Sequence, residues 1–322
     1  MADSSKSNKT LTQTPPAVNS PRAWWLAARP KTLTGAAVPV MMGCALAVRE
    51  SGFGEIRLLP ALLCLLFAFL MQIDSNFIND YFDFVHGNDD ATRLGPKRAC
   101  AEGWITLGTM RKGLVLTSAL ACAVGLPLIF YGGPWLVVVG AACVLFAFLY
   151  TTFFSYKGLG DVLVLVFFGL VPVGFTFYVV VPEPHFNLAV LLSGIACGLV
   201  IDTLLIVNNY RDRDNDRRAG KFTLVVRIGQ HNAEHVYLWL GLIASALVVT
   251  VSCCYPTDPL MPLWEMLVLD AIMLTPYLFW HVSTLKRMRS IGSGRELNTI
   301  LGLTSRNMFT FGVLSSAIFM LF

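Results

Sequence analysis

Residues 58–90, LLPALLCLLFAFLMQIDSNFINDYFDFVHGNDD, change abruptly in character along their length. The first part, residues 58–74, is an almost continuous apolar run that ends at Asp74. The second part, residues 76–90, holds three asparagine amides and four aspartate carboxylates within fifteen residues. The apolar part has the length and composition of a helix that crosses a lipid bilayer. The polar part then predicts a binding site where that helix leaves the lipid.

The rest of the chain repeats this segregation of charge. Its 322 residues are 55% apolar and 14% charged, with a mean hydropathy of +0.64, whereas a soluble domain has roughly 25% charged residues. Lipid admits only helices or closed barrels, and continuous apolar runs lack the alternation of barrel strands. The sequence therefore predicts an all-α, polytopic membrane protein with nine transmembrane helices. The charge-free runs lie between Lys31 and Arg49, Arg57 and Asp74, Lys112 and Lys157 (two spans, broken at Gly132–Pro134), Asp161 and Glu183, Glu183 and Asp202, Glu234 and Asp258, Asp270 and Lys286, and after Arg306.

The basic residues predict the orientation in the membrane. Of the 24 lysines and arginines, 22 fall in the N-terminal segment or in loops that follow even-numbered spans, and only Arg49 and Arg57 lie opposite. By the positive-inside rule the N-terminus is cytoplasmic and the C-terminus lies outside. Residues 1–21 are polar, lack the apolar core of a signal peptide and are predicted to be a disordered cytoplasmic tail. Residues 22–322 form the predicted membrane domain.

Two long loops on the cytoplasmic side each begin with asparagines and aspartates. If the helix of the second span continues past Asp74, then Asn76, Asp80 and Asp83 share one face, with Asn79 beside them. The second cluster, NNYRDRDNDRRAGKFTL at residues 208–224, follows the sixth span. It has a similar stripe at intervals of four, formed by Asn208, Asp212 and Asp216. The two stripes predict two helix ends rich in oxygen ligands on one side of the membrane.

Such carboxylates repel one another unless a cation lies between them, and oxygen ligands suit Mg²⁺. Basic residues accompany both clusters, and arginine and lysine bind phosphate oxygens directly. The combination predicts a site for Mg²⁺ and a diphosphate, whereas either cluster alone could be only a solvated surface. The eight cysteines show no metal-ligand or disulfide pattern, and nothing in the charge favours nucleic acid. The basic residues are Arg93, Lys97, Arg98, Lys157, Arg211, Arg217 and Lys221.

Three other acidic residues are candidates for function. Asp161, in YKGLGDV, begins the fifth span, where a carboxylate either caps the helix or takes part in catalysis. Asp74 and Asp202 lie inside the apolar spans next to the two clusters. Intramembrane acids are functional candidates by default, and both could equally be hydrogen-bonded packing groups.

The two clusters resemble the motifs of the UbiA superfamily of intramembrane aromatic prenyltransferases. Its N-D-x-x-D motif matches Asn79–Asp83, and its D-x-x-x-D motif matches Asp212–Asp216. The chain has Gly87 where much of the superfamily has a third acid, and Asp89 follows two residues later. This variant, with RLGPKRACAEGWIT at 93–106 and GLGDVLVLVFFGLVPVGFTFYV at 158–179, is similar to the branch that prenylates 1,4-dihydroxy-2-naphthoate in menaquinone synthesis. The resemblance runs from about Arg29 to the C-terminus.

The resemblance implies a bundle of nine helices around a central cavity, in the inner (plasma) membrane, with an active site at the cytoplasmic face. It implies Mg²⁺-dependent transfer from polyprenyl diphosphate to 1,4-dihydroxy-2-naphthoate, with release of diphosphate and CO₂. Asp161 is our candidate for the residue that orients or deprotonates the acceptor. Alternatives are another acceptor, such as 4-hydroxybenzoate, homogentisate or a haem, a cation transporter, or a quinone- or lipid-binding scaffold. The implied metal ligands are Asp80, Asp83, Asp212 and Asp216, and the implied substrate-binding residues are Asn76, Asn79, Asn208, Arg93, Arg98, Lys157 and Lys221.

Overall fold

The computed structural model describes residues 14–87, 93–256 and 260–321, and these ranges contain helices and turns but no strand. The all-α prediction is therefore confirmed for the described part of the chain. The helices are α1 (Pro21–Ala28), α2 (Leu33–Ser51), α3 (Leu58–Val85), α4 (Leu107–Gly125), α5 (Ile129–Gly132), α6 (Leu136–Leu149), α7 (Gly160–Val164), α8 (Val171–Val180), α9 (Leu188–Arg218), α10 (Leu224–Cys254), α11 (Leu263–Ile291) and α12 (Leu297–Leu321). Shorter helical turns are η1 (Pro30–Thr32), η2 (Leu126–Leu128), η3 (Tyr150–Phe154), η4 (Ser155–Lys157) and η5 (Leu165–Leu170).

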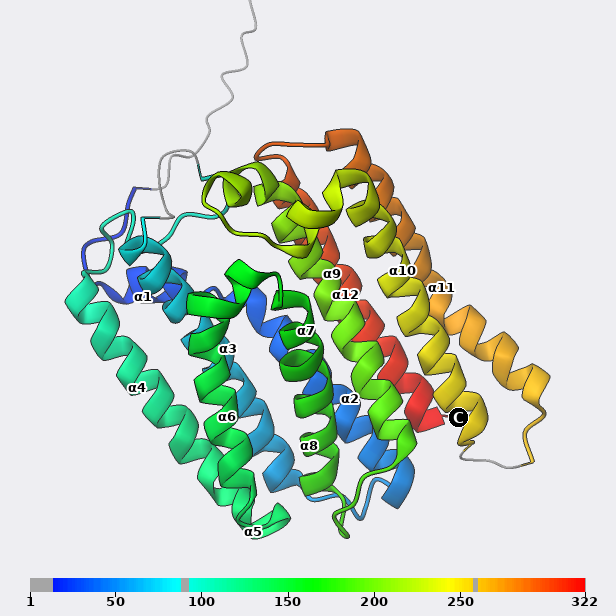
Figure 1. The fold of residues 1–322 in the computed structure, drawn as a ribbon. Coiled ribbons are helices and arrows are strands. Elements are labelled where there is room, and N and C mark those ends of the chain that lie inside the picture. The colour runs from blue at the N-terminus through cyan, green and yellow to red at the C-terminus, as the bar shows by residue number, and fades with distance from the viewer. Residues whose placement is uncertain (1–13, 88–92, 257–259, 322) are drawn as a thin grey trace, which may run out of the picture.

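The long helices lie side by side in one bundle, with α4 at one edge and α11 at the other (Figure 1). α9 lies within the bundle and packs against α10, α12 and the series α7–η5–α8. α2 packs against α8 and α12, and α3 pairs with α4. The central position of α9 matters for function because its far end carries the second acidic cluster.

Glycines allow the fifth span to approach α9 closely. A Cβ atom on Gly169 would lie 2.4 Å from the carbonyl oxygen of Gly194. A Cβ atom on Gly198 would lie 2.9 Å from the Cα of Leu165. Both distances are too short for a side chain, so the contact requires glycine at these positions. Small residues at helix interfaces are the usual means of close packing in membranes.

In the part of the chain that the structure describes, eight helices or helix series are long and apolar enough to cross a bilayer. They include the predicted hairpin between Lys112 and Lys157, which breaks where α5 ends at Gly132 and α6 begins at Leu136. The ninth predicted span lies in α12, which packs against α2, α9 and α11 but is not among the eight. Its first half carries Arg306 and Asn307, so the count of nine stays a prediction.

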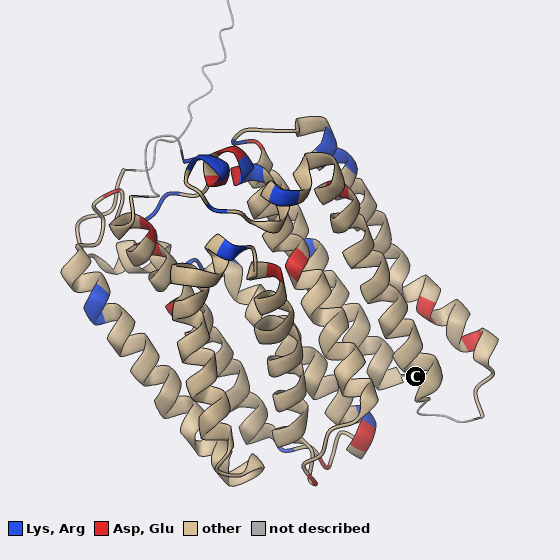
Figure 2. Ribbon diagram, in the orientation of Figure 1, with Lys and Arg blue, Asp and Glu red and all other residues tan. Residues whose placement is uncertain are grey.

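Charged residues gather at one end of the bundle, where α3 and α9 end and α10 begins (Figure 2). We call this the polar end. The chain before α1 also lies there, because the Asn19 N–H donates to the Trp104 carbonyl at 2.8 Å. Residues 1–13 of the predicted disordered tail lie outside the described residues, as do Asp89 and Asp90. The boundary between tail and membrane domain therefore stays a prediction.

Candidate active site

α3 continues through the first polar cluster to Val85, as the spacing of its polar residues predicts. Asp83, partly exposed near the end of α3, forms an ion pair of 2.8 Å with Arg98 from the loop that follows. Asn79, one turn earlier, accepts a hydrogen bond of 2.7 Å from the Thr151 hydroxyl on η3. These contacts direct the last turns of α3 towards η3 and the loop after α3.

Asp80 has a different environment from its neighbours. It is fully buried, and its two oxygens accept hydrogen bonds of 2.8 Å from the N–H groups of Ala99 and Cys100. The guanidinium of Arg29 lies 3.9 Å away. The carboxylate thereby anchors the loop after α3 and is occupied by backbone donors.

Asn76 also has a structural contact. Its amide donates hydrogen bonds of 3.0 Å to the Ala28 carbonyl and to the Thr32 hydroxyl. Those two residues flank the turn between α1 and α2. The predicted substrate-binding residue therefore holds the α1–α2 junction against α3.

The end of α9 is tied to the loop after α3 through Arg211. This buried residue pairs with its neighbour Asp212, with 2.8 Å between Nε and Oδ1. Arg211 also donates to the Asn298 side chain at 2.9 Å, and Asn298 donates to the Leu94 carbonyl at 2.8 Å. Asn298 has no motif around it in the sequence, so only the structure reveals it. Asn208, predicted to bind substrate, is partly exposed one turn before Asp212.

Asp216 brings the two clusters together. Its Oδ1 lies 3.9 Å from the Lys221 ammonium, and its Oδ2 is buried without a hydrogen-bond partner. Asp83 and Asp212 are both close enough to act on Asp216 electrostatically. The ends of α3 and α9, far apart in sequence, therefore lie at the same polar end, close enough for their carboxylates to interact electrostatically.

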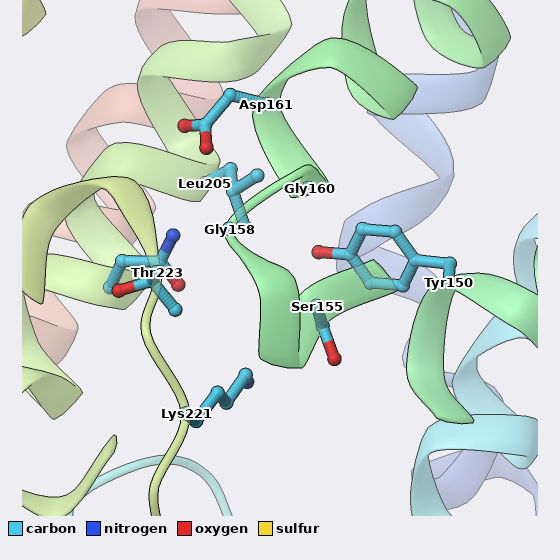
Figure 3. Close-up of a pocket in the computed structure, with 9 residues that line it drawn as sticks. Tyr150, Ser155, Gly158, Gly160, Asp161, Leu205, Lys221 and Thr223 are labelled. Atoms are coloured by element: carbon cyan, nitrogen blue, oxygen red, sulfur yellow. The ribbon is translucent and has the colours of Figure 1, made fainter. Parts of the chain in front are cut away.

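Tyr150 is a residue of this site that the sequence analysis missed, because it stands in an apolar run without a motif. The charges of Asp83, Asp161, Asp202 and Asp216 all act on its side chain. It lines a small cavity of ≈ 10 Å³, room for about one water. The Tyr150 hydroxyl and the Lys221 side chain point towards this cavity from different sides (Figure 3). The other lining residues are Ser155, Gly158, Gly160, Asp161, Leu205, Asn209 and Thr223.

The remaining basic residues lie around this centre. Lys157 is exposed and its ammonium lies 3.9 Å from the centre of the Phe153 ring. Arg93 and Arg98 line a larger cavity of ≈ 440 Å³ between the loop after α3 and the start of α12. The other side chains around that cavity include Lys97, Glu102, Arg295 and Asn298. Cationic groups thus surround the acidic centre on more than one side.

The donor set fits Mg²⁺ together with a diphosphate. Within the described ranges, no three histidine, cysteine, aspartate or glutamate side chains gather closely enough to hold a metal ion by themselves. Mg²⁺ commonly uses only one or two carboxylates and completes its shell with water and phosphate oxygens. Asp83 and the unpartnered Oδ2 of Asp216 would be the candidates for such a pair. The central cavity implied by the resemblance stays a prediction.

Known proteins resemble this chain in sequence and in fold. A model of the UbiA prenyltransferase family matches residues 36–297. A 1,4-dihydroxy-2-naphthoate octaprenyltransferase from Escherichia coli is 39% identical over 70% of this chain and 75% of its own length. One from Mycobacterium leprae is 34% identical over 72% and 79%. Among solved structures, a UbiA homolog from Archaeoglobus fulgidus bound to DMAPP and Mg²⁺ has a TM-score of 0.62 at 16% identity, covering 93% of this chain and 100% of its own. A homolog from Aeropyrum pernix has a TM-score of 0.64 at 15% identity, covering 87% and 96%.

Proposed function

Because this chain belongs to the UbiA prenyltransferase family, we propose that it transfers a polyprenyl group from polyprenyl diphosphate to 1,4-dihydroxy-2-naphthoate. The products are demethylmenaquinol, the reduced form of demethylmenaquinone, together with diphosphate and CO₂. The chain is a multi-pass membrane enzyme, and the names of its relatives support the naphthoate acceptor. The structural observation that supports the proposal most is that Asp83 and Asp216 lie within electrostatic reach of each other, each beside a basic side chain.

The diphosphate of the donor would bind where the two helix ends meet. Asp83 and Asp216 would hold Mg²⁺ there, with Asp212 and Asn79 beside them. Mg²⁺, when bound, would neutralise the diphosphate and stabilise it as a leaving group. Arg98 contacts Asp83 at 2.8 Å, and Lys221 lies 3.9 Å from Asp216. Both cationic groups therefore lie beside the proposed diphosphate site, where they would donate hydrogen bonds to phosphate oxygens.

The transfer itself needs charge stabilisation and a dry environment. As the C–O bond to the diphosphate breaks, its electron pair leaves with the diphosphate, and the cationic side chains stabilise the growing negative charge. The polyprenyl tail would lie among apolar helices, because it is itself apolar. The polar end faces the cytoplasm in this proposal, and the membrane is the inner (plasma) membrane. Asp80, grouped with the metal ligands by its motif, instead supports the site by holding the loop that carries Arg98.

The first prediction tests the metal and diphosphate site. In purified protein with Mg²⁺, Asp83→Asn and Asp216→Asn should each lower the rate of prenyl transfer by about 10²-fold or more, because each removes a charge that positions the leaving group. Glu55→Gln is the matched control, since Glu55 is exposed in the loop between α2 and α3. Transfer is measured by mass spectrometry of the prenylated product. Near-normal rates in both aspartate variants would refute the site.

The same assay identifies the acceptor. Equal concentrations of 1,4-dihydroxy-2-naphthoate, 4-hydroxybenzoate and homogentisate are offered with one polyprenyl diphosphate. Prenylated naphthoate should dominate the products. If the main product came from one of the other two acids, the chain would still be a prenyltransferase, but the assignment of the naphthoate as its acceptor would be wrong.

A further inference from the structure

The close contact between the fifth span and α9 fixes how these two antiparallel segments are aligned. Gly169 lies against Gly194, with 2.4 Å from a Cβ built on Gly169 to the Gly194 carbonyl oxygen. One turn nearer the polar end, Leu165 lies against Gly198, with 2.9 Å between the Leu165 Cα and a Cβ built on Gly198. Towards the polar end, the residue number in contact thus falls by four along the fifth span while it rises by four along α9.

The next step of this series leads to two carboxylates. Asp161 lies four residues before Leu165, and Asp202 lies four residues after Gly198. Asp161 acts on Asp202 electrostatically, which agrees with the alignment. The alignment places the two carboxylates opposite each other at the polar end of the glycine contact.

Neither carboxyl group is fully hydrogen-bonded. Asp202 is 5% exposed, and its Oδ1 is buried without a hydrogen-bond partner. The Oδ1 of Asp161 is likewise buried without a partner, and Asp161 lines the small cavity with Tyr150. Both are unpartnered acceptor atoms, and the one on Asp161 belongs to a residue that lines a cavity, which points to a ligand that supplies a proton or a donor group.

Other ionisable groups lie near the pair, and Asp83 and Asp216 act on Tyr150 together with it. On the elements packed against it, Tyr150 on η3 and Lys221 after α9 line the same cavity as Asp161. Lys221 also lies 3.9 Å from Asp216. Two carboxylates that face each other away from water cannot both be charged without a cation between them, so such a pair holds one proton.

We propose that Asp161 and Asp202 form a carboxyl pair that takes up the hydroxyl proton of the aromatic acceptor during transfer. The proposal rests on the function proposed above and assigns the proton acceptor of that reaction. Asp161 lines the cavity, which has room for about one water, so only the hydroxyl group of the acceptor would enter it, and Asp161 would be the catalytic residue that meets this hydroxyl. Asp202 lies behind it, and as a positioning residue it shares the charge and the proton.

The step balances without any further reagent. The carboxylate-bearing ring carbon of the acceptor forms a C–C bond to the allylic carbon of the donor. In the same step two bonds break: the O–H bond of the acceptor, and the C–O bond between the allylic carbon and the diphosphate. The electron pair of that C–O bond leaves on the diphosphate, and the proton moves to the pair, which becomes neutral. When CO₂ leaves the same ring carbon, its electron pair restores the aromatic ring, and the ring oxygen takes the proton back.

The test compares Asp161→Asn, Asp202→Asn and the double variant with Asp270→Asn. Asp270 is also a buried acid, but it lies on α11, where it accepts a hydrogen bond from Ser252. Each single variant should lower kcat for prenyl transfer by about 10²–10⁴-fold at pH 7, as loss of general base catalysis does. The double variant should lose no more than the worse single variant, because the two groups act as one unit. Binding of ³²P-labelled polyprenyl diphosphate, measured by equilibrium dialysis, should stay within twofold of wild type.

The pH profile separates a proton acceptor from a packing residue. In the two single variants the rate should rise with pH, because ionisation of the acceptor hydroxyl in solution replaces the missing base. A loss that is equal at every pH, or an Asp202→Asn rate within twofold of wild type throughout, would overturn the pair. If the wild-type protein prenylates another phenol but not the naphthoate, the acceptor assignment fails. The variants are then assayed with that phenol as the acceptor. If it prenylates no phenol, both proposals fail.

Discussion

At the scale of single residues, the surroundings of a carboxylate decide its role more than its place in a motif. Asp80 and Asp83 stand three positions apart on α3, yet Asp80 is fully buried under two backbone N–H groups while Asp83 is partly exposed beside Arg98. The first arrangement stabilises a loop, and the second can exchange its partner for a ligand. The motif by itself does not distinguish the two.

Asp80→Asn should therefore destabilise the protein more than Asp83→Asn. An asparagine amide has only one oxygen acceptor, so one of the N–H groups of Ala99 and Cys100 would face an NH₂ group. Loss of a buried acceptor costs about 1–3 kcal/mol. Thermal unfolding of the two purified variants in the same detergent measures the difference. Equal melting temperatures for Asp80→Asn and wild type would show that the loop does not depend on this carboxylate.

At the scale of secondary-structure elements, the contact between η5 and α9 positions the acidic groups. The close approach depends on glycine at positions 169, 194 and 198. Because both segments are helical, moving them apart at this contact would displace the carboxylates one turn further on. Packing within the apolar part of the bundle and geometry at the polar end are thus coupled.

Gly169→Ala should lower both stability and prenyl transfer. Its new Cβ would lie 2.4 Å from a backbone oxygen, which cannot move as a flexible side chain can. Overpacking of this kind costs about 1–3 kcal/mol. Gly140→Ala on α6 is the matched control, since its Cβ would meet nothing within 4 Å. Melting temperature and product formation are measured together, and a Gly169→Ala protein that equals the control in both would contradict the coupling.

At the scale of the whole molecule, the charged residues are concentrated at one end of a largely apolar bundle (Figure 2). The ends of α3 and α9 lie there within electrostatic reach of each other, and hydrogen bonds through Asn298 link α9 to the loop after α3. A diphosphate headgroup needs this polar surrounding, whereas its polyprenyl tail needs the apolar helices below it. Both requirements are met along one axis of the bundle.

The orientation of that axis can be tested by labelling. In a cysteine-free background, Ser293→Cys in the exposed loop at the polar end should be protected from a membrane-impermeant thiol reagent in intact cells. Gly54→Cys, in the exposed loop between α2 and α3, should react, because it lies at the opposite end. Permeabilised cells should label both. The reverse pattern in intact cells would place the polar end outside the cell.

The sequence by itself determined the helical class, the candidate membrane spans and the presence of two polar helix ends, because hydropathy and residue spacing are local properties of the chain. It also carried enough of the family motifs to indicate prenyl transfer. Only the tertiary structure decided that Asp83 and Asp216 interact electrostatically, that Asp80 and Asn76 hold neighbouring backbone, and that Tyr150 lines a small cavity with Asp161. Those outcomes depend on which segments touch across long separations in the chain, and side-chain packing between helices, not local pattern, sets those contacts.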